Sequence, residues 1–196
     1  MPELPDLTVY LEALELRVPG EPCVAARATS PFVVRSVAPP PGVLAGHRVT
    51  ALGRRGKRLV LSFDGDLHLV IHLMVAGRLQ WSDKPPKANR RILFLLEFPR
   101  GTLVLTEAGT KKRASVHVVA GAAGLAAFDR GGLEPLDAGI AEFGARLRSE
   151  NHTLKRALTD PRLFAGIGNA YSDEILHRAK LSPLLLTSRI TDDEVA

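Results

Sequence analysis

The hydrophobic pattern of this chain changes its period near residue 120, and that change restricts the folds open to it. From residue 22 to 119 the apolar residues form short β-rich runs separated by turn signals such as Asp64-Gly65 and Arg100-Gly101. After residue 136 they recur at helical spacing. Strands followed by helices predict an α+β chain.

Seven segments are predicted as strands: 24–29, 49–52, 59–63, 67–73, 92–98, 102–106 and 115–119. The Asp64-Gly65 pair between the third and fourth strands is a strong hairpin signal. Short strands at regular spacing predict a sandwich or a barrel, and the spacing does not distinguish the two.

A helix is predicted at the N-terminus and several more in the last third of the chain. Apolar residues line one face of the first helix, which Pro19-Gly20 ends: Leu4, Leu7, Leu11, Leu14 and Val18. Residues 121–135 predict a short helix and a linker, and 137–149, 153–159 and 170–179 predict helices. Thr191 and Glu194 form a capping box that opens a helix just before Ala196, so we expect the natural protein to continue.

Composition excludes several classes of protein. A single cysteine, Cys23, among 196 residues excludes an internal disulfide and a multi-cysteine zinc site within this chain. No run approaches the roughly 18 apolar residues of a membrane span, and the acidic N-terminus does not resemble a signal peptide, so we expect a cytoplasmic protein. The net charge of +5 permits nucleic acid as a partner.

Basic residues gather at three predicted turns, which are 54–58, 84–91 and 111–113. Such turns can converge on one side of a sandwich and neutralise phosphates, or they can be ordinary solvated loops. Charge alone leaves both interpretations open.

Two histidines occupy the strand 67–73. His68 and His72 share a face but lie four residues apart, about 13 Å on a strand, so they cannot hold one metal ion. We interpret His72 as a hydrogen-bond donor to phosphate or backbone, and His68 as structural.

A glycine-rich turn precedes the helix predicted at 170–179. Gly166 and Gly168 permit close approach of the backbone to a phosphate, and Lys155 and Asn169 support that interpretation. A plain turn between helices is the alternative.

Pro2 follows the initiator methionine, and removal of Met1 leaves a secondary amine at the terminus. An α-amino group titrates near 8, below lysine at about 10.4, so more of it is nucleophilic at neutral pH. Such an amine can attack an aldehyde carbon to form an iminium, with Glu3 moving protons. The alternative is that Pro2 only begins a helix.

Four segments together resemble the formamidopyrimidine-DNA glycosylase and endonuclease VIII family, and the first is closer to the formamidopyrimidine branch. They are Met1-Pro2-Glu3-Leu4-Pro5-Asp6, Gly53-Arg54-Arg55-Gly56-Lys57, Ile71 to Leu79, and Leu154 to Asp160 with Gly166 to Leu176. The resemblance implies an N-terminal helix with an antiparallel β-sandwich in residues 1–120, a linker in 121–136, and a partial helix–two-turn–helix DNA-binding domain in 137–196.

The resemblance also implies a base-excision-repair glycosylase with AP lyase activity on oxidised purines. Pro2 is then the nucleophile, Glu3 the proton shuttle, and Lys57 a third catalytic residue. His72, Lys155 and Asn169 are expected to hold phosphates around a flipped nucleotide in double-stranded DNA. Alternatives are an AP lyase or endonuclease VIII-like enzyme with another lesion preference, and a catalytically weak DNA-binding homologue.

The sequence departs from the family pattern at the residues that fill the gap left in the duplex. Met74 stands at the family's glycine position and Val75 at its methionine position, so either is a candidate. Residues 106–115 contain no aromatic residue at the place of the family's aromatic wedge, and the resemblance leaves Lys112 and Arg113 as candidates for its intercalating arginine. The family's four-cysteine zinc finger is absent from this chain, so zinc is expected only if such a finger follows Ala196. We expect a monomer without a membrane partner, associated with the nucleoid.

Overall fold

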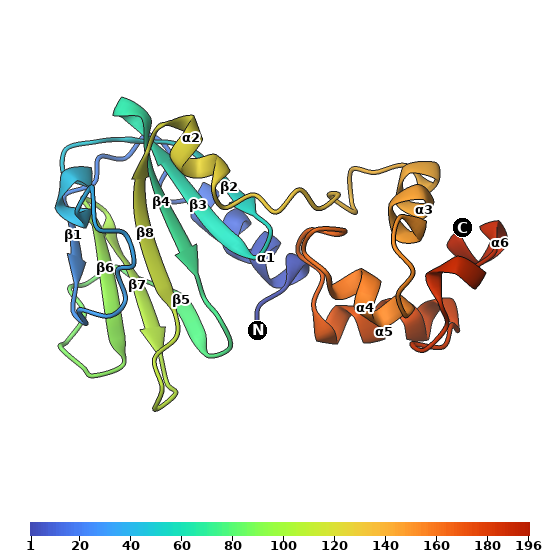
Figure 1. Cartoon of the computed structure of the whole chain (residues 1–196). Coiled ribbons are helices and arrows are strands. Elements are labelled where there is room, and N and C mark those ends of the chain that lie inside the picture. Colours follow the sequence, from blue (N-terminus) through green and yellow to red (C-terminus); the bar gives the residue numbers. More distant parts are fainter. The chain divides into compact units, whose positions relative to one another are not determined.

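A computed structural model describes residues 1–196, which form two compact units, Met1–Phe128 and Asp129–Ala196 (Figure 1). No helix is long and apolar enough to cross a bilayer. The predicted domain ranges 1–120, 121–136 and 137–196 stay a prediction.

Unit 1 is a sandwich of two antiparallel four-stranded sheets, as the resemblance implied. The first sheet has the order β1 (Ala25–Ala28), β6 (Ile92–Phe98), β7 (Gly101–Glu107) and β5 (Gly77–Ser82). The second has the order β2 (Val49–Arg55), β3 (Arg58–Phe63), β4 (Leu67–His72) and β8 (Ser115–Ala120). Each of the seven predicted strands is present, with ends shifted by three residues at most.

One strand, β5, was missed by the sequence analysis. Its apolar residues are Leu79 and Trp81, which alternate with polar residues over only six positions. The pairing of Leu79 with Leu105 of β7 stabilises the strand, because this contact places Leu79 against the core. Because the strand depends on a partner that is distant in sequence, the local sequence pattern contains little evidence for it.

The core lies between the two sheets. Leu59, Leu61, Leu69 and Ile71 of the second sheet are buried with Phe94, Leu96 and Leu105 of the first. Helix α1 (Leu4–Glu15) adds Leu7 and Leu14 to the same cluster, as the spacing predicted. The N-terminus of the chain is therefore attached to the sandwich by apolar packing.

The Asp64-Gly65 hairpin is confirmed. The short 3-10 helix η2 (Asp64–Asp66) joins β3 to the antiparallel β4, and Gly65 has φ 72°. His47 contacts Asp64 through Nδ1 at 2.5 Å, and its ring lies 2.9 Å from where a Cβ on Gly65 would stand. A second 3-10 helix, η1 (Pro41–Leu44), precedes β2.

Three chain segments meet at one end of the first sheet, which we call the loop end. Gly77 begins β5 opposite Glu107 at the end of β7, and Ile92 begins β6 opposite Thr106. The turn at 73–77, the end of segment 83–91 and the start of segment 108–114 therefore share this end (Figure 1).

Unit 1 ends with α2 (Gly121–Ala126), which is the predicted short helix. Unit 2 contains α3 (Ile140–Arg148), α4 (Leu154–Thr159), α5 (Asn169–Ala179), η3 (Thr187–Arg189) and α6 (Asp192–Val195). Its own core includes Leu147, Leu158, Phe164 and Leu176. The capping box of Thr191 and Glu194 is present at the start of α6, as predicted.

Candidate active site

The predicted nucleophile and proton shuttle lie at the start of α1. Pro2 is buried and Glu3 is only 4% exposed. The backbone N–H of Glu3 donates to the Asp6 carboxylate at 2.9 Å, and the Glu3 carbonyl accepts from the N–H of Leu7 at 3.0 Å. These bonds satisfy the helix start and hold the first residues in one conformation.

Lys57 lies at the tip of the β2–β3 hairpin. Gly56 and Lys57 form its two-residue turn, in which Gly56 takes φ 55° at little cost. Burial lowers the pKa of Lys57, and the Glu3 carboxylate acts in the opposite direction. Residues 54 positions apart in sequence are thus within electrostatic range, because α1 packs against β2 and β3.

His72 ends β4 beside the same lysine. Burial, followed by the charges of Arg58, Lys57 and His117, lowers the pKa of His72 to about 4. At neutral pH the imidazole is therefore uncharged, and it can donate one N–H bond to an anion. Glu3, Lys57 and His72 form one electrostatically linked group on unit 1.

Arg58 and His117 adjoin His72, and the sequence analysis did not single them out. The Arg58 guanidinium lies 5.6 Å from the ring centre of Phe128, and the His117 ring packs edge-on against Phe128 at 5.0 Å. Burial and then Arg58 lower the pKa of His117. The signal available for Arg58 was its place in the basic run 54–58, whereas His117 lies on a strand distant in sequence.

His68 is structural, as predicted. It is buried, with Nδ1 3.0 Å from the Ser62 hydroxyl and Nε2 3.3 Å from the Asp66 carboxylate. The ring therefore joins β3 to β4 next to their hairpin.

The β4–β5 turn presents the two candidate gap-filling residues differently. Met74 takes φ 54°, which is unusual for a residue other than glycine, and its side chain is partly buried. Val75 at the tip is 60% exposed. A bond of 2.9 Å from the Gly77 N–H to the Leu73 carbonyl closes the turn.

The two candidate cations in the segment between β7 and β8 have different environments. The Lys112 ammonium donates to the backbone carbonyl of Glu107, whereas the Arg113 side chain is exposed. The geometry favours Arg113 as the cation available to an approaching anion.

In unit 2, Lys155 lies on α4 and Asn169 lies on the neighbouring helix α5. Asn169 is exposed at the first position of α5, after Gly166 with φ 82°. The Lys155 ammonium on α4 contacts both oxygens of Asp173 on α5, at 2.6 and 2.8 Å. Asp173 was missed as the partner of Lys155, since only the packing of α4 on α5 pairs them.

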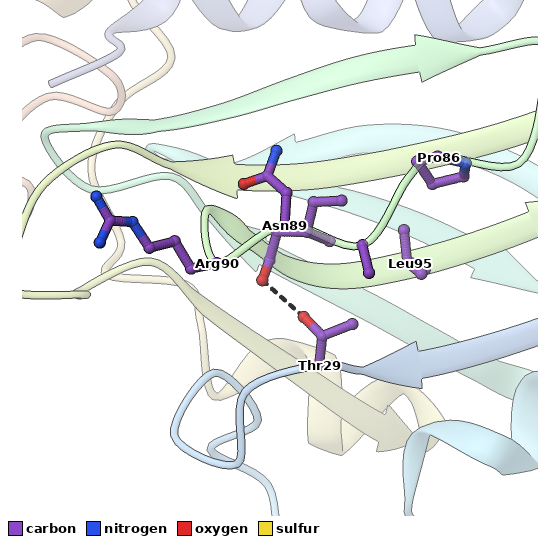
Figure 2. A pocket seen from close by; sticks show the side chains of 7 residues that line it. Thr29, Pro86, Asn89, Arg90 and Leu95 are labelled. Carbon is purple, nitrogen blue, oxygen red and sulfur yellow. Dashed lines mark hydrogen bonds between the residues drawn. The ribbon is translucent and has the colours of Figure 1, made fainter.

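The cavities lie partly away from these residues. A cavity of about 480 Å³ between β1, β6 and the 83–91 segment is lined by Arg90 of the basic turn 84–91 and by none of the predicted catalytic residues (Figure 2). There the Thr29 hydroxyl donates to the Ile92 carbonyl at 2.6 Å, and the Arg90 side chain extends away from Pro86 and Leu95. A cavity of about 250 Å³ is lined by Met1, Pro2, Asp6, Tyr10 and Arg78, and therefore adjoins the predicted nucleophile.

The residues present do not fit the zinc site that the resemblance associates with the family. Cys23 is buried in the core of unit 1, and burial raises the pKa of its thiol to about 11. Nowhere in residues 1–196 do three or more His, Cys, Asp or Glu side chains gather closely enough to hold a metal ion.

Comparison with known proteins agrees with this architecture. Residues 1–114 match the formamidopyrimidine-DNA glycosylase N-terminal domain, and residues 132–196 match the formamidopyrimidine-DNA glycosylase H2TH domain. The formamidopyrimidine-DNA glycosylase of Chloroflexus aurantiacus is 32% identical over 203 residues, covering 100% of this chain and 71% of that protein. The Chloroflexus aggregans enzyme is 33% identical over 204 residues, covering 100% and 72%.

Solved structures give the same result. The complex of Lactococcus lactis Fpg with abasic-site DNA superimposes with a TM-score of 0.87 at 26% identity, covering 98% of this chain and 73% of that one. A complex of LlFpg with THF-DNA and an inhibitor gives a TM-score of 0.88 at 26% identity, covering 99% and 73%. The chain belongs to the formamidopyrimidine-DNA glycosylase family, a family of DNA-repair glycosylases.

Proposed function

We propose that this protein removes oxidised purines, such as 8-oxoguanine and formamidopyrimidines, from double-stranded DNA and nicks the strand. One observation carries the proposal: Pro2 is followed by a buried carboxylate, Glu3, that is coupled to the half-buried Lys57. A terminal amine, a proton carrier and a cation are what imine chemistry beside a phosphate requires.

The reaction begins when removal of Met1 exposes the Pro2 nitrogen. This nitrogen attacks C1′ of the damaged nucleotide, the bond from C1′ to the base breaks, and the base leaves with a proton. Glu3 supplies and accepts protons as the sugar ring opens to an iminium. Loss of a C2′ proton then expels the 3′ phosphate, and loss of the C4′ proton in a second elimination expels the 5′ phosphate.

The remaining site residues bind the DNA. Lys57 and His72 hold phosphates beside the lesion, and Lys155 and Asn169 do so from unit 2. Val75 or Met74, with Arg113 or Lys112, fills the gap left by the flipped nucleotide. We assign the intercalation to Val75 and Arg113, since these two side chains are exposed.

The test is covalent trapping by borohydride, which reduces the iminium to a stable amine. The protein should form a borohydride-dependent adduct with duplex DNA containing 8-oxoguanine or an abasic site. Pro2→Gly should reduce the yield at least tenfold. An undiminished yield in that variant would count against Pro2 as the nucleophile. Intact mass must first show that Met1 has been removed.

The same assay separates the alternatives. Nicking of a preformed abasic site without release of free damaged base would indicate an AP lyase with little glycosylase activity. Salt-sensitive DNA binding without any trapped adduct would indicate a non-catalytic DNA-binding protein.

A further inference from the structure

Glu107, the last residue of β7, is a buried carboxylate outside the catalytic group described above. It is 2% exposed. Its Oε2 accepts the backbone N–H groups of Arg113 at 2.8 Å and Ala114 at 3.1 Å. A buried carboxylate without such donors would be strongly destabilising, so these bonds fix the course of the chain between Glu107 and Ala114.

The backbone of Glu107 connects the same residue to two more segments. Its N–H donates to the Arg91 carbonyl at 2.9 Å, and its carbonyl accepts from the Lys112 ammonium. Glu107 also lies opposite Gly77, the residue that closes the β4–β5 turn. All three segments of the loop end therefore meet at one residue.

The exposed side chains at the loop end have the apolar and cationic character that suits a gap in a duplex. Val75 is exposed on the 73–77 turn, Arg113 on the 108–114 segment, and Arg90 and Arg91 at the end of the 83–91 segment. One apolar tip on the first segment and three cations on the other two suit an opened base step flanked by phosphates. The position of Arg113 depends on the Glu107 carboxylate, whereas the main chain of residue 107 contacts the other two segments.

We propose that the Glu107 carboxylate is a positioning group that holds the 108–114 segment, and Arg113 with it, in one arrangement beside the other two segments before DNA binds. It acts through the backbone N–H groups of Arg113 and Ala114 and does not touch the substrate. Ordering the 108–114 segment in advance avoids an entropy cost on binding, so the carboxylate contributes to affinity for gapped or abasic DNA. This inference rests on the proposed function.

The experiment compares Glu107→Leu with Glu107→Gln in the full chain. Gln retains an oxygen that can accept from Arg113 and Ala114, whereas Leu has a similar volume and no acceptor. The probe is a duplex with a tetrahydrofuran abasic analogue opposite 2-aminopurine, whose fluorescence rises when it is unstacked. We expect Glu107→Leu to bind at least tenfold more weakly with a smaller fluorescence rise, and Glu107→Gln to stay within twofold of the original protein.

A kinetic measurement separates positioning from general damage to the fold. At saturating protein, the single-turnover borohydride trapping rate on abasic DNA should change less than twofold in Glu107→Leu, while the half-saturating protein concentration rises at least tenfold. If Glu107→Leu does not fold, Glu107→Asp provides the test, because its shorter carboxylate cannot span to both N–H groups and should show the same loss.

The outcomes also distinguish this inference from the proposed function. If the unmodified protein neither binds nor traps abasic DNA, the proposed function fails. If the unmodified protein does both and Glu107→Leu matches it in affinity and fluorescence, the positioning role of Glu107 is overturned. Equal losses in Glu107→Gln and Glu107→Leu would also overturn it, since charge rather than hydrogen bonding would then be responsible.

Discussion

The ammonium of Lys155 is bound to both carboxylate oxygens of Asp173, at 2.6 and 2.8 Å. Both side chains are partly exposed, at 38% and 58%. Asn169 precedes Asp173 by one helical turn, so it shares that face of α5. The lysine that we assign to a DNA phosphate is thus paired with a carboxylate of α5.

Asp173→Asn should strengthen DNA binding, because it releases the Lys155 cation and removes a negative charge near the phosphate. Exposed ion pairs contribute at most about 1 kcal/mol, so we expect a gain of about two- to fivefold at low salt. The slope of log affinity against log salt should steepen by about one, as for one added phosphate contact. Fluorescence anisotropy over a salt series measures both.

The matched control is Asp193→Asn on the exposed face of α6, which changes the net charge equally. The affinity of the Asp193→Asn variant for DNA should change less than that of the Asp173→Asn variant. In the background of Lys155→Ala, Asp173→Asn should lose most of its effect. Equal effects of Asp173→Asn with and without Lys155 would contradict the pairing argument.

Glu3→Gln should lower the pKa of Lys57 further. Burial already lowers that pKa, and the Glu3 carboxylate is the group that opposes the shift. Removing the negative charge leaves burial unopposed, so the ammonium loses its proton at a lower pH. The Cε chemical shift of Lys57, followed by NMR against pH, reports the change. Glu12→Gln on the exposed side of α1 is the control, and it should leave the pKa of Lys57 unchanged.

His72 should make the protein less stable in mild acid. Its folded-state pKa of about 4 lies below its ordinary value of 6.5. Between these values the unfolded chain binds a proton that the folded chain does not, so the free energy of unfolding falls as the pH falls from 6.5 toward 4. This group contributes no pH dependence above that window.

His72→Asn removes the titrating group, so its stability should fall less steeply across the same pH range. Urea unfolding at several pH values measures the difference. The lowered pKa of His117 acts in the same direction, so part of the slope should remain in the variant. A profile parallel to that of the unmodified protein would falsify the assignment to His72.

Gly77→Ala should destabilise the β4–β5 turn strongly. A Cβ on Gly77 would stand 2.2 Å from the Leu73 carbonyl oxygen, the atom that accepts the bond closing the turn. Relieving that overlap requires the turn to open, and we expect a loss of about 2 kcal/mol or more. Gly53→Ala is the control, because no atom lies within 4 Å of its added Cβ. Urea unfolding of both variants tests the difference.

Local patterns determined most of the secondary structure of this protein. The leucine spacing of α1, the Asp64-Gly65 hairpin and the capping box at Thr191 each depend on residues close in sequence, and each is confirmed. The order of strands in the two sheets was not predictable in this way, because pairings such as Leu79 with Leu105 join residues far apart.

The candidate site shows the same difference between what local sequence predicts and what tertiary packing decides. The sequence, through its motifs and their family resemblance, predicts Pro2, Glu3, Lys57 and His72 as site residues. Only the tertiary structure brought Lys57 near Glu3 and His72, paired Lys155 with Asp173, and connected Glu107 to three segments. Charge coupling, burial and hydrogen bonding depend on distances in space, and the packing of the sheets and helices decides those distances.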